Sequence, residues 1–226
     1  MAKRLIDLTH PLEAATPPWP GNPPTAVDVL SAIPAERGPG QRGVPGAPVT
    51  CNASAFYSCN HTGTHMDAPA HFYNGVPTID QVPLDHCIGR AVLVDMSDLG
   101  ARGEISPDDL LLHREAISAT GKVVFRTGWS GHWGRDDYFT DYPVLSESAA
   151  IWLVEQGVHL VGLDAPSVDY EPHPAHYVLL GAGMVIVENL TGLEQIATDV
   201  FELIVVPLKL RNLEASVVRA VARVDA

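Results

Sequence analysis

The most chemically informative part of the chain is a short segment rich in side chains that bind metal ions or transfer protons. Between positions 61 and 71 the chain carries three of its ten histidines and one aspartate: His61, His65, Asp67 and His71. Imidazole nitrogens and carboxylate oxygens are suitable ligands for zinc, manganese or iron. A histidine taken alone is usually a hydrogen-bonded surface or core residue, but four such groups at this spacing are hard to explain by packing. The segment therefore predicts a metal site.

The local conformation of this segment decides which side chains share a face. On a helix, His61 and His65 would lie on one face, as in zinc proteases with the H-E-x-x-H motif. Thr62 stands where that motif needs its glutamate, and Gly63 between two β-branched threonines disfavours a helix. In an extended segment alternate residues share a face, so we expect His61, His65 and Asp67 to point the same way. Gly63, on that face, would have no side chain to block an ion.

One segment supplies only part of a coordination shell, so further ligands are expected elsewhere. His176 lies in a polar, proline-rich loop just before an apolar stretch. Glu188 directly follows the apolar run from Met184 to Val187, where a buried carboxylate is costly unless it binds a cation or shifts its pKa. The alternative for Glu188 is that it reaches solvent or caps a turn with Asn189. Other histidines are interpreted as structural: His10, His86, His113, His132 and, in an apolar strand, His159.

The elements that must position these residues are those of an α/β or α+β layered domain, because helical segments separate the predicted strands. Buried strands are predicted at short apolar runs: Ala91 to Val94, Val123 to Phe125, Leu160 to Leu163, Met184 to Val187 and Leu203 to Val206. A helix is expected to start at Ser106, and another to span Ser146 to Gln156. The segment from Val217 to Val224 fits either a strand or a helix.

Length and composition limit the classes of protein to which this chain can belong. The 226 residues fit one domain spanning 1–226. The net charge of -13 argues against a nucleic-acid partner, and no apolar stretch approaches the length of a membrane helix. We expect no membrane association and a cytoplasmic location, since the amino end has no signal-peptide pattern. The glycine- and proline-rich stretch from Arg37 to Pro48 is interpreted as a surface loop, either a lid or a plain connection.

The motif His61-Thr-Gly-Thr-His65-x-Asp67-Ala-Pro-x-His71-Phe resembles the H-x-G-T-H-x-D-x-P-x-H signature of the cyclase family of metal-dependent hydrolases. Further segments resemble the family in the same order: Thr16-Pro-x-Trp19-Pro-Gly21, Arg126-Thr-Gly-Trp129, Gly162-Leu-Asp-Ala-Pro-Ser-Val-Asp169, Pro174-Ala-His176, Glu188-Asn-Leu190 and Pro207-Leu-x-Leu. The resemblance covers nearly the whole chain.

The resemblance implies a fold, a partner and roles for individual residues. The implied fold is a compact single α/β domain with a swivelling β/β/α arrangement and a mixed sheet, in a homodimer or higher homo-oligomer. Five residues are implied as ligands, with the aspartate bridging two ions: His61, His65 and Asp67 for one, and Asp67, His176 and Glu188 for the second. Zinc is the expected metal, as one or two ions, with manganese as the alternative. His71 is implied to transfer protons, and Trp19 to line the substrate pocket, although packing against the proline-rich segment would also explain this tryptophan.

The expected function is hydrolysis of a small molecule. The first hypothesis is an aryl formamidase converting N-formylkynurenine to kynurenine and formate through metal-activated water, with His71 as general acid and base. The second is an isatin hydrolase or another cyclic amide or lactone hydrolase of the same family. The third is a non-catalytic metal-binding protein. A carboxylate-rich ligand set with an extra histidine favours an open, catalytic site over a structural one. The unusual tract from Asp169 to Pro174 leaves the substrate open.

Overall fold

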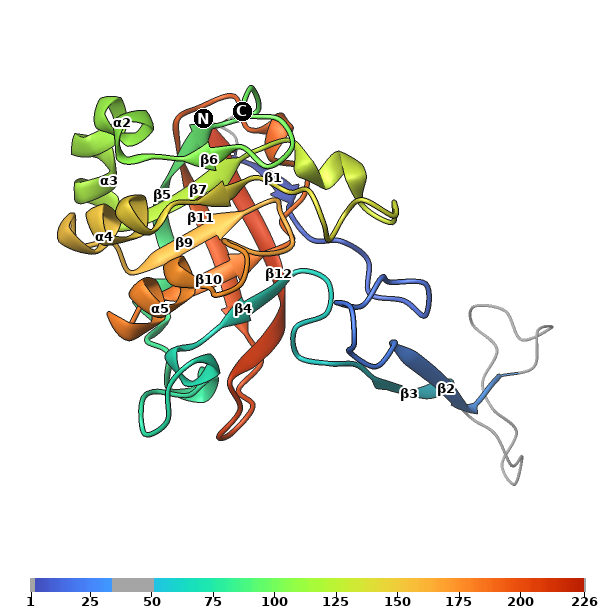
Figure 1. The fold of residues 1–226 in the computed structure, drawn as a ribbon. Coiled ribbons are helices and arrows are strands. Elements are labelled where there is room, and N and C mark those ends of the chain that lie inside the picture. The colour runs from blue at the N-terminus through green and yellow to red at the C-terminus, as the bar shows by residue number, and fades with distance from the viewer. Residues whose placement is uncertain (1–2, 34–50, 226) are drawn as a thin grey trace.

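The computed structural model describes residues 3–33 and 51–225, and a mixed eight-stranded sheet forms its centre (Figure 1). In sheet order the strands are β1 (Lys3–Asp7), β12 (Ala215–Asp225), β11 (Val200–Pro207), β5 (Ile88–Asp95), β7 (Lys122–Arg126), β9 (Leu160–Leu163), β10 (Val185–Glu188) and β4 (His65–Asp67). Strand β4 also pairs with the beginning of β12, so the strands from β12 round to β4 close into a barrel-like ring.

The central strands β5, β7, β9 and β10 run parallel to one another, whereas the other pairs in this sheet are antiparallel. Parallel neighbours need crossover connections, and every α-helix except the first lies in one of these connections. The α-helices are α1 (Leu84–Cys87), α2 (Pro107–Leu110), α3 (Arg114–Thr120), α4 (Glu147–Glu155) and α5 (Pro174–Gly181). Short 3-10 turns are η1 (Pro69–His71), η2 (Ile79–Gln81), η3 (Leu111–His113), η4 (Trp129–His132) and η5 (Leu193–Gln195). Helices α2 to α5 gather on one side of the sheet (Figure 1).

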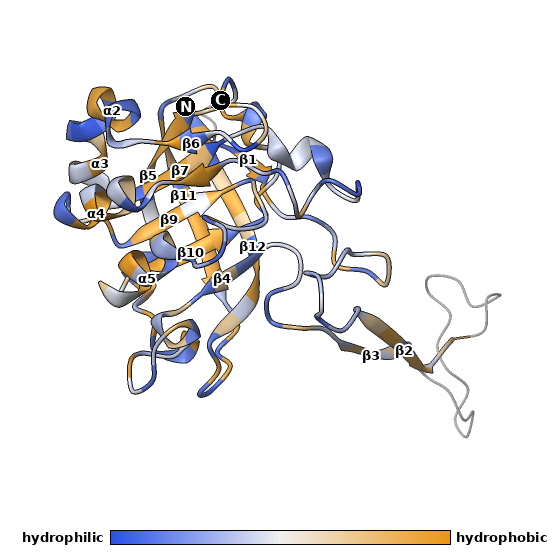
Figure 2. Ribbon diagram, in the orientation of Figure 1, coloured by the Kyte–Doolittle hydropathy of each residue, from blue (hydrophilic) through white to orange (hydrophobic). Residues whose placement is uncertain are grey.

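Alternation along the central strands builds two apolar cores. In β5, Val92 and Val94 face the helices, while Ala91 and Leu93 face the inside of the ring. The apolar colouring of these strands in Figure 2 shows how continuous the buried sheet is. Because both faces of the parallel strands are covered, they appear in the sequence as unbroken apolar runs.

The predicted α/β class with a mixed sheet is confirmed, and each predicted strand run lies within or overlaps an observed strand. Ser146 caps α4 by accepting a hydrogen bond from the Ala149 amide, and Ser106 precedes α2 in a capping box. The carboxyl-terminal segment is a strand. The extent of the domain over 1–226 stays a prediction, and the predicted surface loop at 37–48 lies outside the described residues.

A second, two-stranded sheet pairs β2 (Ala26–Ser31) with β3 (Ala53–Tyr57), and it projects away from the main body (Figure 1). Nearly every residue of these two strands is exposed, including the apolar pair Val27 and Phe56 that face each other across the strands. A third small sheet joins β6 (Glu104–Ile105) to β8 (Val144–Leu145). In the described part of the chain, no helix combines the length and the apolar character needed to cross a bilayer.

Candidate functional site

The signature segment lies around β4, which is inserted between β10 and β12 and fully buried. Alternate residues of a strand share a face, so His65 and Asp67 point the same way. The antiparallel register places Glu188, the last residue of β10, directly opposite His65. Immediately after β4, the turn η1 ends at His71 and brings this imidazole to a ring-centroid distance of 4.1 Å from that of His61.

The predicted extended run is correct for positions 65–67 and wrong for positions 61–64, which form a turn. Gly63 has a φ of +65°, a left-handed conformation that favours glycine. A Cβ added at this position would make only ordinary contacts, 3.8 Å from Thr16 Cγ2 and 3.9 Å from Leu12 Cδ1. The backbone angle, rather than space for an ion, therefore explains the glycine.

Asn189 holds this turn against the end of β10. Its Nδ2 donates to the Gly63 carbonyl at 3.0 Å, and the Thr64 hydroxyl donates to the Asn189 carbonyl at 2.6 Å. Tyr138 completes the arrangement by donating to Asn189 Oδ1 at 2.7 Å. These buried hydrogen bonds fix the position of the loop that carries His61.

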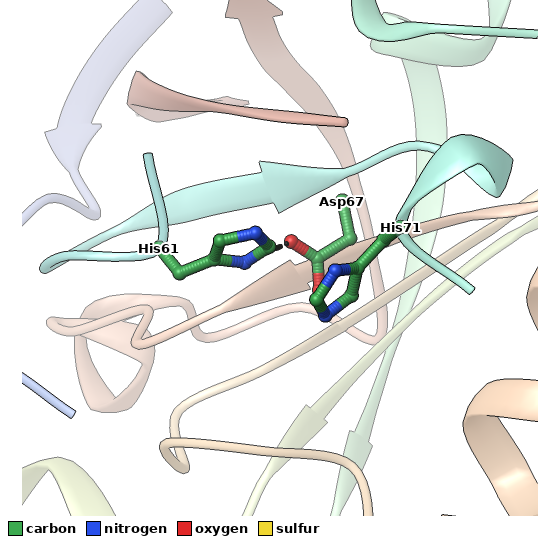
Figure 3. Close-up of side chains that lie close together, drawn as sticks. All are labelled: His61, Asp67 and His71. Atoms are coloured by element: carbon green, nitrogen blue, oxygen red, sulfur yellow. Dashed lines mark ion pairs between the residues drawn. The ribbon is translucent and has the colours of Figure 1, made fainter. Parts of the chain in front are cut away.

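Two buried carboxylates lie among three imidazoles at the centre of the site. His65 Nε2 is 3.4 Å from Asp67 Oδ1 and 3.4 Å from Glu188 Oε2. His176, from the first turn of α5, places Nε2 3.5 Å from Glu188 Oε1 and 3.9 Å from Asp67 Oδ2. His61 Nδ1 is 2.9 Å from Asp67 Oδ1, as Figure 3 shows with His71 on the other side of the carboxylate. The residues expected to bind metal are thus brought together from the turn before β4, from β4 itself, from β10 and from α5.

The outer nitrogen of each imidazole faces an oxygen that orients the ring. His65 Nδ1 lies 2.9 Å from the Gly63 carbonyl, and His176 Nδ1 lies 2.7 Å from Asp169 Oδ1. His61 Nε2 faces Glu214 Oε1 at 3.4 Å. Each of these oxygens can accept a hydrogen bond from the outer N–H, which would leave the inner nitrogen of a neutral ring free to bind a cation. Metal-binding histidines are held in this way.

The electrostatics of the cluster favour positive charge. Burial alone would raise the pKa of the Asp67 carboxyl, but the neighbouring His61 and His65 imidazoles hold it far below its usual range. Burial also opposes protonation of His61, yet the charge and contact of Asp67 raise the pKa of this imidazole to about 11. For His176, burial is outweighed in the same way, and the hydrogen bond to Asp169 raises its pKa to about 10. The buried carboxylates therefore retain a compensating positive charge.

The unsatisfied atoms of the cluster fit a divalent cation. Although His61 comes close, neither oxygen of Asp67 has a partner in hydrogen-bond geometry among the described residues, and the same holds for His65 Nε2. Buried polar atoms normally have such partners. One group of ligand atoms close enough to hold an ion comprises His65, Asp67 and Glu188, and another comprises His61, Asp67 and His71. Nitrogen and carboxylate donors of this kind suit zinc, manganese or iron.

The cluster opens into a cavity of about 300 Å³. One part of its wall is apolar and aromatic, formed by Pro17, Trp19, Phe72, Phe139 and Pro166. Trp19 and Phe139 meet edge to face at 5.5 Å, and Phe72 stacks on the His176 ring at 4.8 Å. The polar lining includes His71, whose pKa burial lowers to about 4, so that its imidazole is neutral at pH 7. A flat, partly apolar molecule can therefore reach the cluster.

Several residues of this site were not predicted from the sequence: Asp169, His173, Asn189, Glu214 and Phe139. The spacing of Asp169, His173 and His176 was an available signal, because three such side chains within eight positions repeat the pattern of the signature segment. For Glu214 there was no signal, because it lies in the turn before β12. Of the histidines interpreted as structural, His10 is buried and stacks on Trp133 at 3.9 Å.

The chain is similar to a known protein family and to several known proteins. The family model described as "Putative cyclase" matches residues 6–170. The chain is 34% identical over 224 residues to kynurenine formamidase of Bordetella petrii, covering 98% of each chain. It is 32% identical over 221 residues to kynurenine formamidase of Bacillus cereus, covering 96% of each. Isatin hydrolase A of Labrenzia aggregata, solved with benzyl benzoate bound, has a TM-score of 0.81 and 27% identity, covering 99% of this chain and 94% of that one.

The fold and the donor cluster define a hydrolase with a site suited to a divalent metal ion. The chain belongs to the cyclase family, as the signature segment indicated, because the family model and both curated relatives match over most of its length.

Proposed function

We propose that this protein hydrolyses an aryl formamide, with N-formylkynurenine as substrate and kynurenine and formate as products. The chain is an amidohydrolase acting on a carbon–nitrogen bond other than a peptide bond. The observation that carries the finer proposal is the aromatic cavity, because it leads an aryl group directly to a cluster of imidazoles and carboxylates. Identity of about a third to two kynurenine formamidases, along nearly the full length, adds support.

Five residues are proposed to hold the metal. His61, His65 and Asp67 form one ligand set, and Asp67, His176 and Glu188 the other, with the aspartate shared between them. Zinc is the proposed ion and manganese the alternative, bound as one or two ions. A divalent cation held there supplies Lewis-acid polarisation of the carbonyl and lowers the pKa of water. The chain itself orients the ligands through Gly63, Asp169 and Glu214, which lie outside the two sets.

His71 is proposed as the general acid and base. Its ring lines the cavity and lies 4.1 Å from the His61 ring and 6.1 Å from the His176 ring, measured between centroids. A neutral imidazole can take a proton from attacking water and deliver it to the leaving nitrogen of an aryl amine. Trp19, with Phe139 against its edge, is proposed as the wall on which the substrate ring packs.

A substrate panel tests the proposal. Purified protein loaded with zinc, and separately with manganese, is assayed with N-formylkynurenine, isatin and an aryl lactone. We expect kcat/KM to be highest for N-formylkynurenine. Fastest turnover of isatin would favour the second candidate, which the likeness to isatin hydrolase A supports. Tight metal binding without hydrolysis of any of the three would favour a non-catalytic metal-binding protein.

A homodimer is proposed to cover the β2–β3 sheet, and a cytoplasmic location stays a prediction. Val27 and Phe56 are 51% and 61% exposed on a projecting two-stranded sheet, and such hairpins are marginally stable in water without a covering partner. We expect Phe56→Lys to lower the mass measured by light scattering to that of a monomer. The matched control is Leu112→Lys, at an apolar side chain that is 96% exposed on η3. An unchanged mass for the Phe56 variant would exclude this interface.

A further inference from the structure

The cavity wall offers few groups that could bind a carboxylate on a substrate. No lysine or arginine is among the described residues that line the cavity. Outside the metal cluster, a carboxylate on a substrate would therefore have to be bound by neutral hydrogen-bond donors. Apart from the imidazoles and Glu188, the polar side chains on the wall belong to Asn22, Cys59, Ser167 and Asn189.

Only one of these four side chains is a strong donor that the protein leaves free. The Asn189 amide is hydrogen-bonded through both its nitrogen and its oxygen. The Ser167 hydroxyl is buried and accepts the Asp169 backbone N–H at 3.5 Å, and a thiol such as that of Cys59 is a weak donor. Within residues 3–33 and 51–225, by contrast, the one hydrogen bond that Asn22 makes is through its backbone N–H. Its side-chain amide is therefore available to a ligand.

The backbone that carries Asn22 is held in place by its neighbours. Its N–H donates to the Trp19 carbonyl at 2.9 Å, and this bond closes a turn in which Gly21 has a φ of +95°. Pro23 follows, and a residue before proline is restricted to extended conformations. One turn of the cavity wall thus carries both Trp19, the proposed wall for the substrate ring, and the free amide of Asn22.

We propose that Asn22 is a specificity-determining residue whose side-chain NH2 donates a hydrogen bond to a carboxylate on the substrate. The favoured substrates are aryl formamides that carry an amino-acid side chain, over aryl formamides without one. This inference rests on the proposed function and assigns a substrate class to the same cavity. An amide suits the role because it does not titrate, so its N–H groups are donors at every pH. Its oxygen is an acceptor for the ammonium group of the same amino acid.

The test compares N-formylkynurenine with N-(2-acetylphenyl)formamide, which keeps the ring, the formamide and the ketone but lacks the amino-acid group. The quantity measured is the ratio of kcat/KM for the first substrate to kcat/KM for the second. We expect Asn22→Leu, which replaces the amide by apolar groups of similar shape, to lower this ratio about 10- to 100-fold, mainly through KM. Asn22→Asp should lower it at least as far, because a carboxylate donates no hydrogen bond and repels the substrate carboxylate. The matched control is Asn74→Leu, at an exposed asparagine in the loop after η1.

Zinc content of each variant, measured by elemental analysis, separates this role from a structural one. We expect all three variants to bind as much zinc as the wild type and Asn74→Leu to keep the wild-type ratio. Loss of zinc, or an equal fall in kcat/KM for both substrates, would show that Asn22 only supports the cavity wall and would overturn the inference. A wild-type ratio in Asn22→Leu or in Asn22→Asp would overturn it as well, while leaving the proposed function intact. A wild-type enzyme that hydrolyses neither substrate would overturn both.

Discussion

Replacing Asp169 by asparagine tests whether the protein holds its metal through oriented imidazoles. The carboxylate accepts three N–H donors, two of them from His176 through Nδ1 at 2.7 Å and the backbone nitrogen at 2.9 Å. An amide has one acceptor oxygen, so it can satisfy only one of these two. If the oxygen faces the backbone, the amide NH2 faces Nδ1, and the ring proton must move to Nε2. That atom would then present a proton, instead of a lone pair, toward Glu188.

The expected magnitude follows from the bond that is lost. A hydrogen bond to a charged group contributes about 1.5–3 kcal/mol, and loss of such an outer partner typically weakens metal binding about 10- to 100-fold. We therefore expect Asp169→Asn to raise the dissociation constant for zinc by that factor, which corresponds to about 1.4–2.7 kcal/mol.

The assay is a competition between the protein and a chromogenic chelator of known zinc affinity. The matched control is Asp98→Asn, at an exposed aspartate in the loop after β5. Circular dichroism of both variants verifies that they are folded. A folded Asp169→Asn protein that binds zinc within twofold of the wild type would refute the reasoning, because the orientation of His176 would then be irrelevant to metal affinity.

The remaining predictions concern single side chains. His71→Ala should retain its zinc on elemental analysis and lose about 10²- to 10⁴-fold in kcat, with His113→Ala as control; equal loss of zinc would make His71 a ligand. Trp19→Ala should raise KM for an aryl formamide about 2- to 10-fold at unchanged metal content, and an unchanged KM would place this ring outside the substrate site. Burial lowers the pKa of His10 to about 4, so the folded state binds this proton less tightly than the unfolded chain, and stability falls as pH drops from about 6.5 to about 4. Urea titrations should show that His10→Phe reduces this fall by at most about 3 kcal/mol, and curves that coincide with the wild type would contradict the shift. Burial raises the pKa of the Cys87 thiol to about 11, so iodoacetamide at pH 8 should label the exposed Cys51 first and reach Cys87 only on unfolding, as peptide mass mapping would report.

Local sequence patterns determined most of the secondary structure and the types of ligand. The buried strands were evident because each is covered on both faces and therefore appears as an uninterrupted apolar run, as in Leu160–Leu163. The start of α4 was evident because a serine cap acts within one turn. His65 and Asp67 could be assigned to one face because they belong to a single short strand. Each of these inferences depends on residues close together in the chain.

Tertiary structure alone decided how the site is completed. The turn that carries His61 depends on Asn189, which is 126 positions away from Gly63 in the chain. The orientation of the His61 ring depends on Glu214, which reaches this ring because β12 pairs with β4. The carboxyl-terminal segment had no preference that distinguished strand from helix until β11 and β4 provided partners on its edges. The residue types that can bind a metal were visible in the sequence. The contacts that orient each imidazole nitrogen were not, because hydrogen bonds between distant segments leave no periodic pattern in a single sequence and form only when the sheet closes.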